Sequence, residues 1–358
     1  MVLLIQNSIK TTRLFRYDYL KLLTCNGFKV SVLAIDDCQI SKDCLESLGV
    51  NLILISGETS FFKRFFLFNK LIIKLLMSGK VRHIQCHFLA TILVCYPSLL
   101  MASKKTTLFI EGLGTVFLRS KALRRVFRFL FTAPSFKRVF MNKFERSELG
   151  IESDLVLGGI GVCDKFFDTK RRYVCSSKLK IGYFGRLVID KGVNDCLFIA
   201  DKLIKEKVDF VFSFYGDIYP QNPTSLTRKD IDSAESKYAG VVNFHGFTED
   251  VISSMDNVDI VVLPSRCEGF PVIVMEANSL GKPVFVYDVP GCRDAVCDGV
   301  NGFVIRGINP GKMTESIISY SKLSDIEKNN LYSQSIEYAS INFRRVDKNK
   351  AILQAILR

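Results

Sequence analysis

Short apolar runs of strand length alternate with helical stretches along almost the whole chain, and this alternation is the strongest constraint on its fold. Parallel strands need crossover connections and are buried on both faces, so such alternation is typical of parallel sheets covered by helices on both sides. We therefore expect an α/β protein with doubly wound, Rossmann-like sheets. The predicted strands are Val2–Gln6, Val30–Ile35, Leu52–Ile55, His83–His87, Leu108–Ile110, Val139–Met141, Leu155–Leu157, Lys180–Phe184, Phe210–Tyr215, Val241–Phe244, Ile260–Leu263, Val284–Val286 and Gly302–Val304.

A glycine-rich stretch near the middle of the chain separates two series of strands. It runs from Gly158 to Phe167, and a polar stretch from Asp168 to Ser177 follows it. With 358 residues, 48% of them hydrophobic, the chain has enough apolar material for two cores. We expect one domain over residues 1–163, a second over residues 164–340 with a cleft between them, and a last helix over residues 341–358 that packs back toward the first domain.

The net charge of +13 predicts an anionic partner, which could be nucleic acid, an anionic membrane or a phosphorylated ligand. The eleven cysteines have neither a C-x-x-C pattern nor the spacing of a disulfide framework, so we expect reduced thiols and a cytosolic setting. The first ten residues become polar too soon for a secretory signal. The longest uncharged run, Phe88 to Ser103, is shorter than a spanning helix of about 20 residues requires.

The segment LPSRCEGFPVIVMEANSLGKPVFVYD, from Leu263 to Asp288, contains the most informative chemistry. Glu268 precedes a predicted helix and Glu276 lies within it, and each carboxylate could accept hydrogen bonds from a vicinal diol. Pro271 suits a first helical position, so we expect the helix to start at Gly269, Phe270 and Pro271. Free backbone N–H groups at a helix start attract phosphate. The order diol, anion, diol is that of a nucleoside diphosphate sugar.

A second segment, IGYFGRLVIDKGV, places two cations just after a predicted strand. Gly185 and Arg186 end the strand, and Lys191 follows in the loop. A guanidinium and an ammonium at the carboxyl end of a parallel strand suit a diphosphate that gains charge as a leaving group. The alternative is an ordinary surface arginine and lysine beside a turn.

Together, FGRLVIDKG, HGFTEDV, LPSRCEGFPVIVMEANSLGKPV and GCRDAVCDGVNGFVI resemble the donor-binding half of the retaining glycosyltransferases of family 4, which have the GT-B fold. The resemblance implies that the second domain binds the donor and the first the acceptor. It implies that Arg186 and Lys191 bind the donor diphosphate, that Glu268 lies by the donor sugar and that Glu276 binds the ribose. Backbone amides around Gly269, Phe270 and Pro271 would hold sugar and phosphate. It implies no metal or other cofactor, and the three histidines lack a metal-binding spacing.

The first half departs from that family in two loops. Residues 7–12, after the first strand, lack the glycine-rich turn that is frequent in the family. Glu111 stands where many relatives have a histidine, and the following Gly112 and Gly114 resemble the GLG-type loop of bacterial O-antigen transferases. Glu111 is therefore a candidate catalytic residue for holding a donor or acceptor hydroxyl, although it could equally be a buried structural carboxylate. His87, Gly112 and Gly114 are possible contacts of the acceptor or the sugar.

Two basic stretches, residues 61–80 and 119–138, contain no acidic residue. In the first, Lys63, Arg64, Lys70 and Lys74 would share one narrow helical face. Both could contact an anionic membrane surface, and the alternative for the first is a core helix with a solvated charged face.

The function expected is retaining transfer of a hexose or N-acetylhexosamine, with UDP as the guessed carrier, to a polyprenyl-diphosphate-linked or growing surface glycan. The expected location is the cytoplasm, on the inner face of the membrane. The alternatives are a nucleotide-sugar epimerase of the same architecture and, with less support, a basic nucleic-acid-binding protein, for which no sequence motif is present. A Rossmann dehydrogenase is weaker still, because the first strand is not followed by G-x-G-x-x-G.

Overall fold

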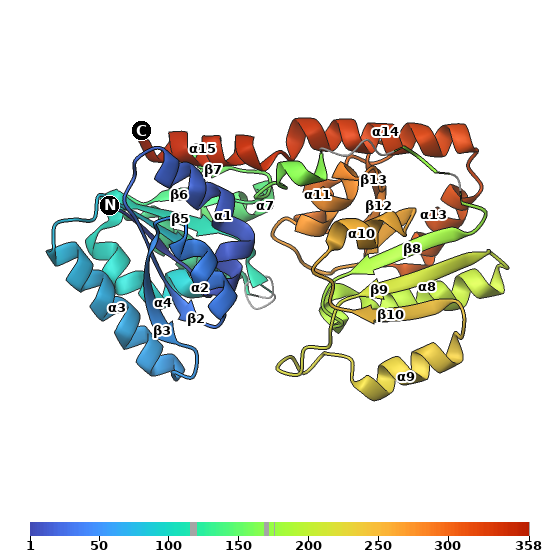
Figure 1. The fold of residues 1–358 in the computed structure, drawn as a ribbon, viewed down its shortest axis with the longest axis horizontal. Coiled ribbons are helices and arrows are strands. Elements are labelled where there is room, and N and C mark those ends of the chain that lie inside the picture. The colour runs from blue at the N-terminus through green and yellow to red at the C-terminus, as the bar shows by residue number, and fades with distance from the viewer. Residues whose placement is uncertain (115–119, 168–171, 175, 358) are drawn as a thin grey trace. The chain divides into compact units, whose positions relative to one another are not determined.

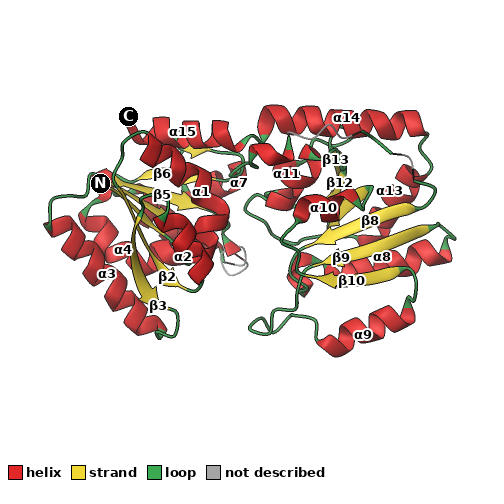
Figure 2. Ribbon diagram, viewed as in Figure 1, coloured by secondary structure: helices red, strands yellow, loops and turns green. Residues whose placement is uncertain are grey.

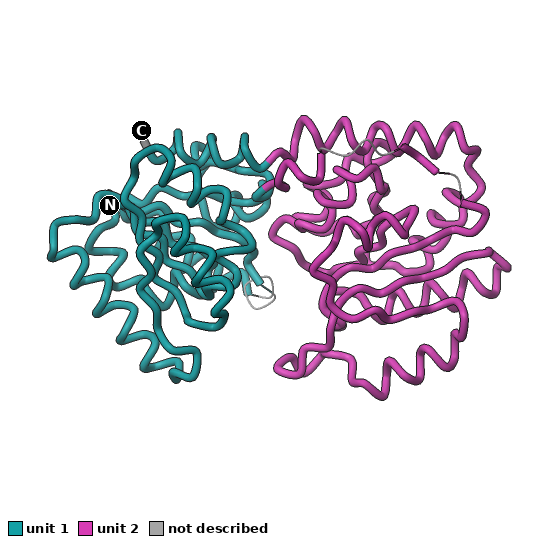
Figure 3. The backbone as a smooth tube through the Cα atoms, viewed as in Figure 1, with its two compact units in different colours: residues 1–160, 345–358 teal, residues 161–344 magenta. Residues whose placement is uncertain are grey.

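The chain forms two compact units, and each contains one parallel sheet (Figures 1 and 3). The computed structural model spans residues 1–358 and describes all of them except 115–119, 168–171, 175 and 358. Unit 1 comprises Met1–Ile160 with Arg345–Arg358, and unit 2 comprises Gly161–Arg344. The first unit thus ends at Ile160 rather than at residue 163, and the second ends at Arg344 rather than at residue 340.

The sheet of unit 1 has the strand order β3-β2-β1-β4-β5-β6-β7, and every pairing is parallel. This order reverses between β1 and β4, as in doubly wound folds. The strands are β1 (Val2–Ile5), β2 (Val30–Asp36), β3 (Asn51–Ser56), β4 (His83–His87), β5 (Thr106–Ile110), β6 (Lys137–Phe140) and β7 (Leu155–Val156).

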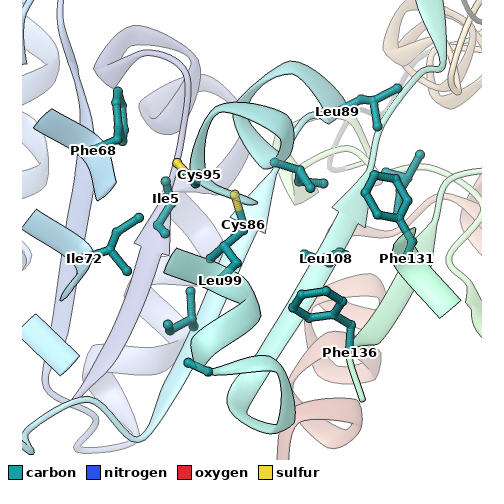
Figure 4. Packing of buried hydrophobic residues seen from close by; sticks show 14 of the residues in the cluster. Ile5, Phe68, Ile72, Cys86, Leu89, Cys95, Leu99, Leu108, Phe131 and Phe136 are labelled. Atoms are coloured by element: carbon teal, nitrogen blue, oxygen red, sulfur yellow. The ribbon is translucent and has the colours of Figure 1, made fainter. Parts of the chain in front are cut away.

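Helices cover this sheet, and one core fills the space on the face turned to α3, α4 and α6 (Figure 4). Ile5 and Cys86 from neighbouring strands pack there with Phe68 from α3, Leu99 from α4 and Phe131 from α6. The helices of unit 1 are α1 (Ile9–Cys25), α2 (Gln39–Glu46), α3 (Phe61–Met77), α4 (Leu89–Met101), α6 (Lys121–Thr132), α7 (Lys143–Leu149) and α15 (Arg345–Leu357).

Unit 2 repeats the same topology with six parallel strands in the order β10-β9-β8-β11-β12-β13 (Figure 2). The strands are β8 (Leu179–Phe184), β9 (Phe210–Tyr215), β10 (Val242–Gly246), β11 (Ile260–Leu263), β12 (Val284–Tyr287) and β13 (Gly302–Ile305). The helices are α8 (Val193–Lys205), α9 (Arg228–Lys237), α10 (Val251–Asp256), α11 (Val272–Ser279), α12 (Cys292–Ala295), α13 (Pro310–Ser321) and α14 (Asp325–Asn342).

Each predicted strand coincides with an observed strand, so the expected α/β class with two doubly wound sheets is confirmed. The strand ends differ from the predicted ones by at most two residues, as in β6, which starts at Lys137 rather than at Val139. Lys137 and Arg138 can join this strand because Arg138 is buried and bound by Asp154, 2.8 Å away. Among the described residues, no helix is both long and apolar enough to cross a membrane.

Two buried asparagines fix α11 against the turn that precedes β13. The Nδ2 of Asn301 donates to Asn278 Oδ1 at 2.7 Å and to the carbonyl of Ala295 at 3.1 Å. Its Oδ1 accepts from the backbone N–H of Cys297 at 2.7 Å. Asn278 in turn donates to the Asn301 carbonyl at 2.7 Å. Both side chains are fully buried, so this network sets where α11 lies relative to the sheet.

Replacing Asn301 by alanine should lower the free energy of unfolding of unit 2 by about 3 kcal/mol, because three hydrogen bonds of about 1 kcal/mol each are lost. Calorimetric melting of the full chain measures this, with the exposed Asn330→Ala as the matched control. Equal stability of the two variants would contradict the role assigned to the network.

Candidate functional site

The loops after β8 and β11 meet at the reversal point of the second sheet, which is where ligands bind in open parallel sheets. The structure brings the predicted donor-binding residues to this edge. Gly185, Arg186 and Lys191 follow β8, and Glu268, Gly269, Phe270 and Pro271 follow β11, while Glu276 lies in α11.

Lys191 and Glu268 form an ion pair across these two loops. Lys191 Nζ lies 2.6 Å from Glu268 Oε1, and the side chains are 22% and 14% exposed. The next residue, Gly192, has a φ of 82°, and a Cβ there would lie 2.2 Å from the carbonyl oxygen of Pro264. Only glycine therefore lets the Lys191 turn pack this closely against the end of β11.

Arg266 ties the same two loops together through backbone and side-chain bonds. Its guanidinium donates to the carbonyl of Ile189 at 3.0 Å and to Asp195 Oδ1 at 3.1 Å, and its N–H donates to the carbonyl of Asp190 at 3.0 Å. The Asp195 carboxylate also accepts from the Tyr287 hydroxyl at 2.8 Å. Burial, followed by this carboxylate, holds the pKa of Tyr287 well above its usual value. These hydrogen bonds thus fix the two loops relative to each other before any ligand binds.

The sequence analysis did not identify these hydrogen bonds of Arg266, Asp195 and Tyr287. Arg266 lies two residues before Glu268, but a polar loop residue is ordinary there, and Asp195 and Tyr287 are distant in sequence. No local signal identifies such a partnership, because it depends on the order of the strands.

Arg186 is exposed and its guanidinium carbon lies 5.0 Å from the centre of the Tyr219 ring. Among the described residues, no carboxylate forms an ion pair with Arg186. A cation held by an aromatic face and not neutralised by an acid is suited to binding an anion. Gly185 lies against β9, because a Cβ on Gly216 would come within 1.9 Å of the Gly185 carbonyl oxygen.

The predicted helix start is displaced by one residue. Pro271 has a ψ of 117° and is the N-cap, so α11 begins at Val272 and Pro271 is not its first helical residue. Among the described residues, no side-chain cap hydrogen bond is present at this end of the helix. An uncapped helix start that follows the Glu268 loop directly suits an anion. Glu276 is half-buried four residues into the helix, about 6 Å along its axis.

The Glu268 loop rests on Gly291, which precedes α12. Gly291 has a φ of 81°, and a Cβ there would lie 2.5 Å from the carbonyl oxygen of Glu268 and 2.6 Å from that of Gly269. Both atoms belong to the backbone, so no side-chain rotation could relieve the contact. The glycine of the GCRD run therefore fixes the course of the loop that carries Glu268.

In unit 1, the structure brings Glu111 together with His87, and with Arg16 of α1, which the sequence did not suggest. His87 Nδ1 lies 2.8 Å from Glu111 Oε1, and Arg16 also bonds that oxygen. The N–H of Gly112 donates to Glu145 Oε1 at 2.7 Å. Gly114 has a φ of 73°, and no atom of the described residues would lie within 4 Å of a Cβ there.

The basic stretch of residues 61–80 forms α3, and one expectation about it is wrong. Lys63, Lys70 and Lys74 are exposed, but Arg64 is half-buried and donates to the Gly57 carbonyl at 2.5 Å. One residue is 100° of helical turn, so Arg64 cannot share the face of Lys63. Large apolar side chains are exposed instead, at Phe61, Phe62, Phe66 and Met77.

The second basic stretch contains α6, which exposes Arg125, Val126 and Phe129. Arg124 is not free, because it pairs with Glu148. Arg119 lies outside the described residues.

Residues 168–340, which make up most of unit 2, match the family described as glycosyl transferases group 1. Solved structures show the fold of the whole chain. A glycosyltransferase from Rickettsia africae superposes with a TM-score of 0.79 at 15% identity and covers 99% of this chain and 97% of its own. The Anabaena protein HepE, crystallised with UDP and glucose, has a TM-score of 0.78 at 18% identity, with 99% and 98% covered. The chain therefore has the GT-B fold.

A sequence relative from Campylobacter jejuni is named N,N'-diacetylbacillosaminyl-diphospho-undecaprenol alpha-1,3-N-acetylgalactosaminyltransferase. It is 29% identical over 58% of this chain and 59% of its own length. The match thus spans less than two thirds of that relative. The chain resembles proteins of surface-polysaccharide synthesis, among them a capsular polysaccharide glycosyltransferase of Staphylococcus aureus that is 27% identical over 39% of this chain and 36% of its own.

Replacing Gly291 by alanine should displace the Glu268 loop, because the new methyl group meets two carbonyl oxygens. Hydrogen exchange of the backbone amides in residues 264–273 should become at least about ten-fold faster, which corresponds to about 1.4 kcal/mol of lost protection. Gly299→Ala is the matched control, because Gly299 has a similar φ of 76° and nothing within 4 Å. Equal exchange in the two variants would refute the contact.

Proposed function

We propose that the chain is a retaining glycosyltransferase that moves a sugar from a nucleoside diphosphate carrier to a lipid-linked or growing surface glycan. The observation that carries this proposal is the Lys191–Glu268 pair, 2.6 Å apart at the reversal point of a group 1 domain. Beside it lie Arg186, a cation that pairs with no carboxylate among the described residues, and a helix start without a side-chain cap.

The diphosphate is proposed to bind between Arg186, Lys191 and the first turn of α11. Arg186 supplies a planar fork of donors, Lys191 a compact charge, and α11 its backbone N–H groups. Lys191 would be shared between Glu268 and a phosphate oxygen, so the carboxylate holds the ammonium in place until the donor arrives. Glu268 would also accept hydroxyls of the donor sugar, with Gly269 and Phe270 beside it, and Glu276 those of the ribose. No metal or other cofactor is part of this proposal.

In the transfer step, the bond between the anomeric carbon and the terminal phosphate oxygen breaks, and the acceptor oxygen bonds the same face of that carbon. The acceptor proton passes to the departing phosphate oxygen, so the step needs no protein nucleophile. The leaving diphosphate gains negative charge, which Arg186, Lys191 and α11 would stabilise. One positioned donor to such a developing charge typically contributes about 10²–10³-fold in kcat.

UDP is the proposed carrier, with a hexose or N-acetylhexosamine as the sugar. The support is the complex of HepE with UDP and glucose, together with the name of the Campylobacter relative, which specifies N-acetylgalactosaminyl transfer to a diphospho-undecaprenol-linked sugar. We propose that the acceptor is likewise linked to a polyprenyl diphosphate. Glu111 of unit 1 is proposed to hold a substrate hydroxyl, with His87, Gly112 and Gly114 as neighbours.

An epimerase of the same architecture is the second candidate, because it would bind the same donor with the same groups. It differs in needing no acceptor. A changed nucleotide sugar formed without acceptor would favour the epimerase.

The surface of α3 is proposed to contact an anionic inner-membrane leaflet, which would place the chain peripherally on the cytoplasmic side. We define the α3 surface as the exposed Phe62, Phe66 and Met77 with Lys63, Lys70 and Lys74. Exposed aromatic side chains beside lysines, without an acidic residue in the helix, suit the boundary between lipid headgroups and acyl chains. The basic stretch of residues 119–138, with Arg125 and Phe129 exposed on α6, is proposed to contribute in the same way.

Lys191→Met should lower kcat for transfer from the UDP-sugar by about 10²-fold or more, because it removes a charge that the leaving diphosphate needs. Transfer to a polyprenyl-diphosphate-linked sugar, measured over a panel of nucleotide sugars, tests this. Lys205→Met is the control, since Lys205 also pairs with a carboxylate, Asp201 at 2.8 Å, but on the surface of α8. Retention of kcat in Lys191→Met, or no donor accepted from the whole panel, would overturn the proposed function.

The double variant Phe62→Ser with Phe66→Ser should bind vesicles of anionic phospholipid at least about ten-fold more weakly, because two aromatic side chains no longer enter the interface. Co-sedimentation measures the binding. Ile326→Ser with Ile341→Ser is the matched control, because these two exposed apolar residues lie on α14 of unit 2. Equal binding of both double variants would reject the α3 surface.

A further inference from the structure

A buried polar cluster lies at the carboxyl ends of β1, β4 and β5 in unit 1. We define it as Gln6, Arg16, His87 and Glu111. Ile5 pairs with Cys86 in the parallel ladder, so Gln6 and His87 follow in register and point to the same face of the sheet. This is the face opposite the core cluster that contains Ile5 and Cys86. Arg16 reaches the cluster from α1.

The charges of this cluster are fixed by one arginine. Burial would raise the pKa of Glu111, but the charge of Arg16 and the hydrogen bonds from His87 and Arg16 outweigh burial and leave the pKa below its usual value. Burial, followed by the charge of Arg16, lowers the pKa of His87 to about 4. The cluster at neutral pH is thus a guanidinium, a carboxylate and a neutral imidazole.

The hydrogen-bond geometry assigns the imidazole proton to Nδ1. Nδ1 lies 2.8 Å from Glu111 Oε1, where an unprotonated nitrogen would repel the carboxylate. Nδ1 therefore donates a hydrogen bond to Glu111. Because a protonated Nδ1 cannot accept, Arg16 lies 3.2 Å from it without a hydrogen bond between them. Arg16 donates to Oε1 as well.

The two oxygens of Glu111 are consequently unequal. Oε1 accepts hydrogen bonds from both Arg16 and His87, whereas Oε2 accepts none from a described residue. The side chain keeps 8% of its surface exposed, so it is not sealed off from a ligand. Oε2 is a carboxylate oxygen with acceptor capacity and a direction set by the groups that hold Oε1.

We propose that Arg16 and His87 are positioning residues, which bind Oε1 of Glu111 and thereby direct its Oε2 toward a neutral hydroxyl of the substrate. This inference rests on the proposed function, because it specifies how Glu111 would hold that hydroxyl. Because Arg16 already balances Glu111, the cluster has no surplus positive charge for a phosphate. Its ligand class is an uncharged polyol, such as a sugar ring.

Unsatisfied polar atoms in the same cluster favour a ligand site over a purely structural ion pair. Gln6 is 1% exposed, and neither its Nε2 nor its Oε1 has a partner among the described residues. His87 Nε2 and Arg16 Nε are likewise buried without a partner there. An unpartnered buried polar group costs about 1–3 kcal/mol, so a cluster that retains several is suited to accepting hydroxyl groups.

Other titratable groups lie near this cluster on α1, β4 and α7. Tyr19 of α1 accepts a hydrogen bond from Gln85 at 2.7 Å, and burial keeps the pKa of Tyr19 above its usual value. Cys86 on β4 points to the opposite face, into the core, and burial raises the pKa of its thiol well above its usual value. Glu145 of α7 accepts a hydrogen bond from the N–H of Gly112, and burial raises the pKa of Glu145 to about 8. Glu145 is thus the group whose titration must be separated from that of Glu111.

The test is the pH profile of kcat/KM for sugar transfer by the full chain. Without Arg16, burial is no longer opposed by a charge, so the pKa of Glu111 rises. We expect the acidic limb to move to higher pH by at least about one unit in Arg16→Met and to move less in Arg16→Lys. At pH 7, kcat/KM should also be about ten-fold lower in Arg16→Met, because Oε2 of Glu111 is no longer held toward the hydroxyl. In a Glu111→Gln background, Arg16→Met should change kcat/KM by less than about two-fold. The Glu145→Gln variant identifies any limb near pH 8 that belongs to Glu145.

An unmoved acidic limb in Arg16→Met, or the same loss in the Glu111→Gln background, would overturn the inference. If Arg16→Met does not fold, Arg16→Lys and His87→Gln replace it. For each, the position of the acidic limb and the change of kcat/KM in the Glu111→Gln background are measured. If Glu111→Gln transfers sugar as the wild type does while Lys191→Met fails, the cluster has no role in the reaction but the proposed function stands. Activity in both of those variants would remove the proposed function itself.

Discussion

The half-buried ion pair between Lys191 and Glu268 is the interaction on which the candidate site depends. It joins the two loops that leave the second sheet at its reversal point, and different contacts fix the backbone of each loop. Gly192 lets the Lys191 turn pack on Pro264, Gly291 supports the backbone of Glu268, and Arg266 binds the carbonyls of the opposite loop. Because these supports are backbone contacts and hydrogen bonds within the protein, the two charges are positioned before a ligand arrives, as preorganised electrostatic stabilisation requires.

The two units have the same strand order up to the sixth strand of each, yet their reversal points carry different chemistry. Unit 2 presents cations and an uncapped helix start, which suit a diphosphate. Unit 1 presents a balanced arginine and glutamate with neutral amide and imidazole groups. Its first loop also differs, because Ser8 caps α1 and binds Asp37 at 2.5 Å where a glycine turn would let a ligand approach the backbone. In the function proposed here, one topology therefore provides an anion site in one unit and a polyol site in the other.

Much of the fold could be predicted from the sequence, because buried parallel strands are continuous apolar runs bounded by polar turns. Glu268, Arg186 and Lys191 were also predictable as a group, since all three lie just beyond strands whose carboxyl ends share one edge. The start of α11 was misplaced by one residue, because proline permits both the N-cap and the first helical conformation. Arg16 and Arg266 could not be found, since each acts on residues far away in sequence. Arg64 was wrongly placed because it follows Lys63 directly, and adjacent residues of a helix lie about 100° apart around its axis.

The central claim is that the loops after β8 and β11 hold the diphosphate of the donor. A crystal structure of the full chain with bound UDP tests it most directly. The account predicts phosphate oxygens within about 3.2 Å of the Lys191 ammonium and the Arg186 guanidinium, with the terminal phosphate at the first turn of α11. A diphosphate bound elsewhere, with the Lys191–Glu268 pair undisturbed, would contradict it.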